Sequence, residues 1–78
     1  MNVHERLEEL IRTFFNDDSI VLTDALLPAD VPGWDSLAQV NLLFSIGEEF
    51  GVAFSDAELE SLATVGDIER TLQRKLGG

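Results

Sequence analysis

The chain has 78 residues, contains no Cys and carries 15 acidic against 5 basic residues, for a net charge of −10. We expect one domain over residues 1–78, without disulfides or thiolate metal sites. The negative charge argues against binding to nucleic acid or to an anionic membrane. No apolar run approaches the roughly 20 residues of a membrane span, and residues 1–6 lack the apolar core of a signal peptide. We therefore expect a cytoplasmic protein without membrane insertion.

The basic residues are confined to the two ends of the chain, because residues 13–69 contain no Lys or Arg. All acidic residues except Glu5, Glu8 and Glu9 lie in that stretch. Such a surface attracts partners with basic docking patches and speeds their encounter. Solubility alone explains the net charge equally well, but it explains the missing basic residues less well.

Apolar residues recur at helical spacing over residues 3–15 and predict an amphipathic first helix. The sequence Asn16-Asp17-Asp18-Ser19 ends it. Residues 16–34 then mix turn residues with apolar anchors, among them Trp34, and predict a long structured loop. A structured loop of this length in a small domain is often functional.

A second helix is predicted over residues 36–50, with Asp35 as its N-cap and Gly51 as its C-cap. A helical wheel separates its apolar residues into two stripes. The first stripe suits a core face, whereas the second is either buried in a central helix or faces a pocket or partner; the pattern leaves both possibilities open. The first stripe holds Leu42, Leu43, Ile46 and Phe50, and the second holds Leu37, Val40 and Phe44, together with Ser36 and Gly47.

Two capping signals predict the remaining helices. Ser55 with Glu58 forms a capping box that opens a short third helix, and Thr64 with Asp67 opens a last helix. The apolar face of that last helix contains Val65, Ile68, Leu72 and Leu76. The predicted fold class is all-α: a four-helix bundle with a long first loop and a short third helix.

The sequence Gly33-Trp34-Asp35-Ser36-Leu37 resembles the D-S-L attachment motif of acyl carrier and peptidyl carrier proteins. The tripeptide alone is a weak signal, but here it opens a helix after a long loop, and the resemblance covers nearly the whole acidic chain. It implies a bundle of the acyl-carrier type. It also implies that Ser36 receives 4'-phosphopantetheine from coenzyme A, added by a separate phosphopantetheinyl transferase that reads Asp35 and Leu37 as well.

The resemblance further implies a monomeric carrier that is not an enzyme. The thiol of the arm holds acyl groups as thioesters, which explains thioester chemistry in a chain without Cys. The implied partners are an acyl- or aminoacyl-loading ligase and downstream transferases with basic docking surfaces. The implied partner-binding residues are Val40, Phe44, Glu48, Glu49, Asp56 and Glu60.

The chain departs from many fatty-acid carriers in ways that favour a specialised pathway. Ala38 and Asn41 stand where those carriers have acidic residues, and the Trp34-Asp35-Ser36 sequence is similar to that of D-alanyl and specialised carriers. Phe44 replaces a Met or aliphatic residue, and we expect it to narrow any groove between the second and third helices. A small or polar cargo follows, although Leu37, Val40, Leu59 and Leu62 offer apolar lining for such a groove.

Two alternatives stay open. One is an aminoacyl, peptidyl or D-alanyl carrier, and the other is a helical protein-interaction module that never carries phosphopantetheine. We predict no catalytic residue and no metal site, because His4 has no Cys or second His to pair with. The acidic clusters also lack the calcium-loop pattern.

Overall fold

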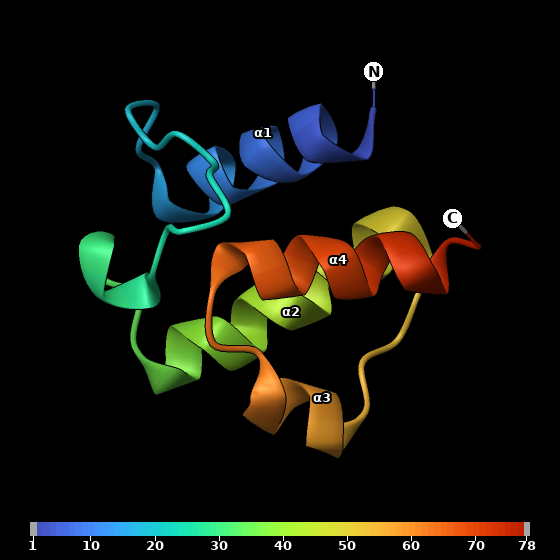
Figure 1. Ribbon diagram of the computed structural model, residues 1–78. Helices are drawn as coiled ribbons and strands as arrows, with labels where there is room; N and C mark the ends of the chain where they lie inside the picture. Colours follow the sequence, from blue (N-terminus) through green and yellow to red (C-terminus); the bar gives the residue numbers. More distant parts are fainter. Residues whose placement is uncertain (1, 78) are drawn as a thin grey trace.

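The computed structural model describes residues 2–77, which form four α-helices and no strand (Figure 1). The helices are α1 (Val3–Phe15), α2 (Ser36–Phe50), α3 (Asp56–Ser61) and α4 (Val65–Lys75), with a short 3-10 helix, η1 (Pro28–Asp30), before α2. The all-α prediction is confirmed, and α1 and α2 have the predicted bounds. The sequence pattern does not predict η1, because Pro28 and Asp30 in so short a segment are equally typical of a turn.

Capping residues fix the helix starts where the sequence predicts them. Asp35, Ser55 and Thr64 each accept a hydrogen bond from a backbone amide in the first turn of their helix. In α3 and α4 an acidic residue closes the capping box. Helix α2 ends at Phe50 and is capped by Gly51, whose φ of 71° is left-handed and is adopted by Gly without strain.

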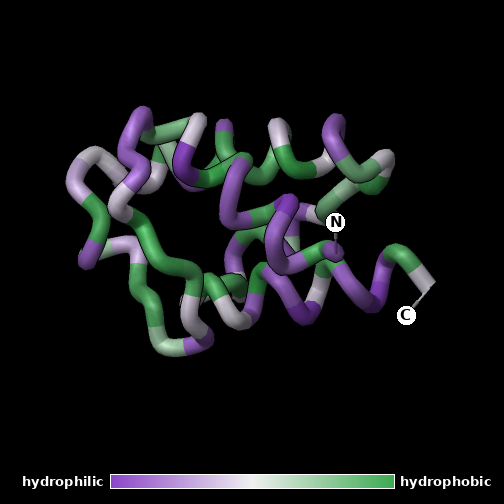
Figure 2. Tube along the Cα trace, turned by 90° about the horizontal axis from the view of Figure 1, so that it is seen from above, coloured by the Kyte–Doolittle hydropathy of each residue, from purple (hydrophilic) through white to green (hydrophobic). Residues whose placement is uncertain are grey.

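The core lies where α1 packs against α2 and α4. Green apolar and purple polar residues alternate along these helices, as expected for amphipathic helices with one buried face (Figure 2). Leu76 is an exception to the prediction: it lies just after α4 and is 41% exposed. The fully buried core side chains are Leu7 and Ile11 of α1, Leu42, Leu43 and Ile46 of α2, and Val65, Ile68 and Leu72 of α4.

The long loop between α1 and α2 is anchored at several points, as predicted. Arg12 of α1 donates a hydrogen bond from Nε to the carbonyl oxygen of Ile20, at 2.7 Å. The amide of Val65, at the start of α4, donates to the carbonyl oxygen of Leu26, at 3.0 Å. These contacts fix the chain that leads into α2. The buried side chains of the loop are Ile20, Leu22, Val31 and Trp34.

Candidate functional site

Ser36 is the first residue of α2 and is exposed. Asp35 caps the helix: its Oδ1 accepts a hydrogen bond from the amide of Ala38 at 2.8 Å. The amides of Ser36 and Leu37 come too early in the helix to reach a helical carbonyl. Of the four helices in residues 2–77, α2 alone has no acidic residue in its first turn. The positive end of its dipole therefore suits an anion on Ser36 Oγ.

Trp34 and Gln39, which flank Ser36 in the sequence, take part in a hydrogen-bonded bridge. The indole of Trp34 is 6% exposed and stacks on Phe15, with ring centroids 5.1 Å apart. Its Nε1 donates to Gln39 Oε1 at 2.6 Å, and Gln39 Nε2 donates to the carbonyl oxygen of Leu62 at 3.4 Å. The bridge thus connects the loop, α2 and the end of α3.

Trp34 packs on the bundle, as its place among the apolar anchors of the loop predicts, but the sequence pattern does not predict the bridge. The residue in the sequence that could have indicated the bridge is Gln39, because it is the one polar residue that interrupts the core stripe of α2. A polar residue on an otherwise apolar face needs a hydrogen-bonding partner when it is shielded from water. Its partner here comes from another element, so the sequence pattern gives no means of finding it.

The second apolar stripe of α2 is exposed. Leu37 and Phe44 are 70% and 69% exposed and Val40 is 37% exposed, whereas Ile46 of the first stripe is completely buried. Because the three residues are spaced by three and four positions, they share one helix face beside Ser36. The sequence left open whether the second stripe is buried or faces a pocket or partner. The exposed side chains show that it is not part of the core, which the first stripe forms.

Gly47 differs from its neighbours on the second stripe, because it is buried. A Cβ at this position would lie 2.6 Å from the carbonyl oxygen of Val52. The amide of Val52 in turn donates to the carbonyl oxygen of Gly47 at 2.9 Å. The missing side chain therefore lets the chain after α2 lie directly against the helix.

A groove of about 320 Å³ separates α2 from the segment that leads into α3. Phe44 and Glu48 line it from α2, Phe54 from the connecting segment and Leu59 from α3. Phe44 lies about 12 Å along the helix axis from Ser36, at about 1.5 Å per residue. Of the four residues considered as lining in the sequence analysis, Leu59 is part of this groove. The other three, Leu37, Val40 and Leu62, are not among its lining residues.

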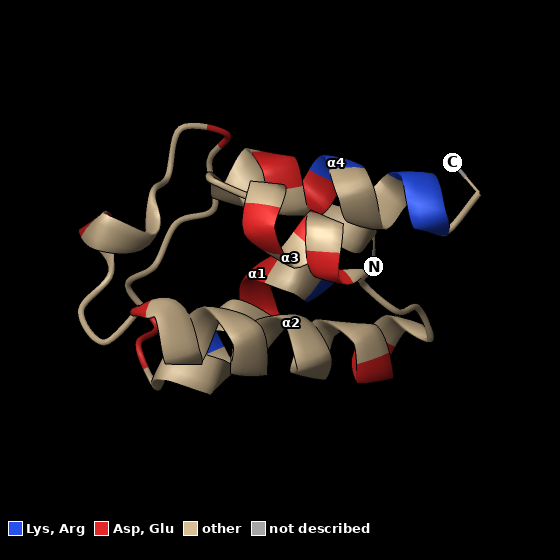
Figure 3. Ribbon diagram, turned by 90° about the horizontal axis from the view of Figure 1, so that it is seen from below, with Lys and Arg blue, Asp and Glu red and all other residues tan. Residues whose placement is uncertain are grey.

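Carboxylates of α3, α4 and the C-terminal part of α2 share one side of the molecule (Figure 3). Within residues 2–77, Glu48, Asp56 and Glu60 are exposed and form no ion pair. Glu49 pairs with Arg6, at 3.3 Å. The three unpaired carboxylates are therefore the ones with their full charge available to a basic partner.

Glu58 has a different role from the other acidic residues of α3. Lys75 Nζ lies 2.8 Å from its Oε1. The hydrogen bond from Lys75, with a further one from the Ser55 amide, lowers the pKa of Glu58 to about 2. This carboxylate ties α3 to the end of α4.

The part of the chain that the structure describes contains no group of three or more His, Cys, Asp or Glu side chains placed to hold a metal ion. None of its helices combines the length and the apolar character that crossing a membrane requires. His4 is exposed and lies 2.6 Å from Glu69, so that it links α1 to α4.

Comparison with known proteins gives a consistent result. The phosphopantetheine attachment site family matches residues 5–72. An acyl carrier protein of Thermotoga maritima is 46% identical over 61 residues, which cover 78% of this chain and 74% of the relative. An acyl carrier protein of Phenylobacterium zucineum is 32% identical over 76 residues, which cover 97% of this chain and 96% of the relative.

Two solved structures share the fold. The solution NMR structure of the holo acyl carrier protein from Geobacter metallireducens has a TM-score of 0.90 and 36% identity, and the match covers 99% of this chain and 88% of that one. A putative acyl carrier protein from Mycobacterium tuberculosis has a TM-score of 0.83 and 25% identity, with 94% and 97% covered. The chain therefore belongs to the acyl carrier protein family, whose members are carriers, not enzymes, and whose cofactor is covalently attached 4'-phosphopantetheine.

Proposed function

We propose that Ser36 carries the phosphopantetheine arm and that the protein delivers acyl thioesters to the enzymes of a specialised biosynthetic pathway. The exposed Ser36 hydroxyl at the start of α2 is the observation that carries this proposal. A phosphodiester on Ser36 Oγ places its negative charge beside the amides of Ser36 and Leu37, in a first turn whose own residues are not acidic and whose N-cap, Asp35, accepts from Ala38. The attached arm supplies the thiol that the chain lacks.

The residues around Ser36 have distinct parts in this proposal. Asp35 fixes the helix start, and with it the direction in which the Ser36 side chain leaves the surface. Leu37 is exposed next to Ser36 and offers the transferase an apolar contact. Trp34 is buried, so it supports the loop and leaves the cargo to other residues.

Mass spectrometry tests the attachment. Incubation with coenzyme A and a promiscuous phosphopantetheinyl transferase is expected to add one phosphopantetheinyl group. Ser36→Ala is expected to abolish the addition, whereas the control Ser61→Ala, at another exposed helical Ser, retains it. Modification that persists in Ser36→Ala refutes the site. If several transferases leave the protein unmodified, the interaction module without an arm becomes the better interpretation.

Family membership implies a phosphopantetheinyl transferase and biosynthetic enzymes as partners. We propose that the enzymes that load and use the cargo, a ligase and downstream transferases, present basic surfaces and meet a monomer in the cytoplasm. The exposed stripe residues and nearby carboxylates support this, since apolar side chains beside charges of one sign suit a docking surface. The proposed contacts are Val40, Phe44, Glu48, Glu49, Asp56 and Glu60.

We also propose a small or polar acyl cargo. The Gln39 bridge holds α2 to the end of α3 close to Ser36, and an acyl chain that enters there must break its hydrogen bonds. Farther along, the rigid ring of Phe44 borders the groove. The Trp34-Asp35-Ser36 sequence keeps an aminoacyl or D-alanyl group among the candidate cargoes.

Thermal unfolding of the holo protein loaded with short and long acyl groups tests the cargo. Each methylene that becomes buried contributes up to about 0.8 kcal/mol. We expect little gain in stability with chain length. A steady rise from short to long chains would restore the fatty-acid assignment.

A further inference from the structure

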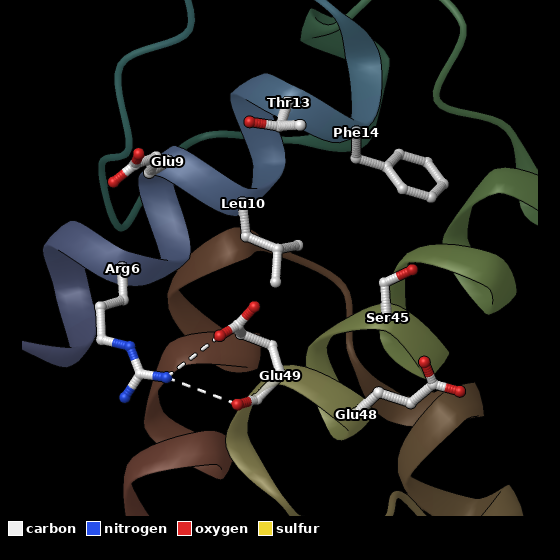
Figure 4. A pocket seen from close by; sticks show the side chains of 8 residues that line it. All are labelled: Arg6, Glu9, Leu10, Thr13, Phe14, Ser45, Glu48 and Glu49. Carbon is white, nitrogen blue, oxygen red and sulfur yellow. Dashed lines mark hydrogen bonds and ion pairs between the residues drawn. The ribbon is translucent and has the colours of Figure 1, made fainter.

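A second and larger groove, of about 620 Å³, lies between α1 and α2 (Figure 4). Leu10 and Phe14 of α1 are half-buried and supply its apolar surface, and Leu10 points toward α2. Thr13 of α1 and Ser45 of α2 add small polar side chains. Neither Ser36 nor the exposed stripe of α2 lines this groove, which shares only Glu48 and Glu49 with the proposed docking contacts.

The groove is strongly acidic. Glu9, Glu48 and Glu49 line it, and Arg6 is the one cation among its lining residues in the described chain, residues 2–77. Arg6 is already engaged: its Nη2 lies 3.3 Å from Glu49 Oε2, and its guanidinium lies 4.4 Å from the centre of the Phe50 ring. Glu9 and Glu48 form no ion pair within residues 2–77. An apolar floor is thus flanked by unneutralised carboxylates.

We propose that this groove binds a basic amphipathic helix of a partner protein. An apolar side chain of that helix packs on Leu10 and Phe14, and flanking Lys or Arg residues pair with Glu9 and Glu48. A second copy of this chain is a poor occupant, because its net charge of −10 repels an acidic groove.

Glu48 connects this groove to the surface on which partner enzymes are proposed to dock. Glu48 lines both this groove and the one beside Phe44. A partner helix between α1 and α2 therefore borders the surface over Phe44 and competes with an enzyme docked there for Glu48. Such a partner leaves Ser36 uncovered, because Ser36 does not line the groove.

Nuclear magnetic resonance titration of the full-length, ¹⁵N-labelled protein tests the proposal. The probe is a helical Leu/Lys peptide of about five turns with one apolar face. The matched peptides replace every Leu by Ser or every Lys by Glu. We expect the Leu/Lys peptide alone to shift the amide signals of Leu10, Thr13 and Ser45. The Ser-containing peptide tests the apolar contact, and the Glu-containing peptide tests the charge.

Variants then locate the binding. Thr13→Arg fills the groove with a cation and is expected to weaken peptide affinity about tenfold or more, whereas Gln73→Arg on the exposed surface of α4 leaves it unchanged. Glu9→Gln is expected to weaken affinity about two- to fivefold, the effect of one exposed ion pair. Glu5→Gln, on the same helix but outside the groove, is its control.

Three results would overturn the proposal: shifts confined to Phe44 and Leu59, equal binding of the Ser-containing peptide, or undiminished binding by Thr13→Arg. Concentration-dependent dimerisation that Thr13→Arg abolishes would also overturn it, by identifying a second copy as the occupant. Ser36→Ala is expected to bind the peptide normally. Failure of phosphopantetheine attachment therefore leaves this test valid.

Discussion

The two apolar stripes of α2 contain similar residues but have opposite environments. Ile46 is fully buried in a core cluster with residues of α1 and α4, while Leu37 and Phe44 are about two-thirds exposed or more. The packing of the helices accounts for the difference. The core cluster joins the first stripe to residues of α1 and α4, and it includes none of Leu37, Val40 and Phe44. Apolar composition alone therefore does not decide burial.

The largest expected effect comes from truncating one residue of each stripe. Ile46→Ala is expected to lower the free energy of unfolding by about 2–5 kcal/mol, because it leaves a cavity in the core. Phe44→Ala is expected to cost less than about 1 kcal/mol, since its ring is largely solvated already. Urea denaturation measures both.

Phe44→Ala is expected to reduce the function of the protein more than Ile46→Ala does, although it reduces the stability less. Phe44→Ala impairs loading or transfer by partner enzymes, and the assay is the rate of acyl loading on the holo protein. A Phe44 variant that is poorly folded but fully active would reverse the assignment of the two stripes.

The hydrogen-bonded bridge formed by Gln39, within the core stripe, gives the next largest effect. Gln39→Ala removes the acceptor of the Trp34 indole N–H while the ring stays buried. An unsatisfied buried donor costs about 1–3 kcal/mol. Asn41→Ala, an exposed polar truncation on the same helix, is the control and is expected to change stability by no more than about 0.5 kcal/mol. Equal stability of the two variants in urea would show that the bridge contributes nothing.

Charges beside the exposed stripe are expected to act on association kinetics. Replacing Glu48 and Glu60 by Gln and Asp56 by Asn is expected to lower the on-rate of a basic partner about tenfold at low salt. The wild-type on-rate falls as salt rises toward physiological strength. Stopped-flow mixing measures both rates, with Asp18→Asn in the first loop as the control. An on-rate indifferent to salt would contradict electrostatic docking.

The smallest expected effect is on the pH dependence of stability and comes from Glu58, which pairs with Lys75 while its neighbours Asp56 and Glu60 form no ion pair within the described residues. Its folded-state pKa of about 2 lies below the ordinary value of 4.5. Its contribution to stability is therefore present above about pH 4.5 and is lost as the pH falls toward 2. Glu58→Gln should make the pH dependence of the melting temperature shallower in this range, whereas Glu60→Gln on the same helix should not. Identical curves for wild type and Glu58→Gln would exclude the contribution.

Much of the fold was predictable because its signals are local. Asp35, Ser55 and Thr64 cap helices through amides three residues away, and residues 3–15 show their helical period directly. The D-S-L sequence at Ser36 is equally local, so the candidate attachment site also follows from the sequence. Leu76 marks a limit of periodicity, because the helical pattern continues one residue beyond the end of α4.

The helices, the acidic character and the candidate site at Ser36 thus follow from the order of the amino acids. Which stripe of α2 is covered, which carboxylates are neutralised and where the grooves lie depend on how the helices pack. These features depend on residues far apart in the chain, as in the pairing of Arg6 with Glu49 or of Glu58 with Lys75. No periodic pattern records such a contact, because the distance between the two partners is set by the packing of whole helices.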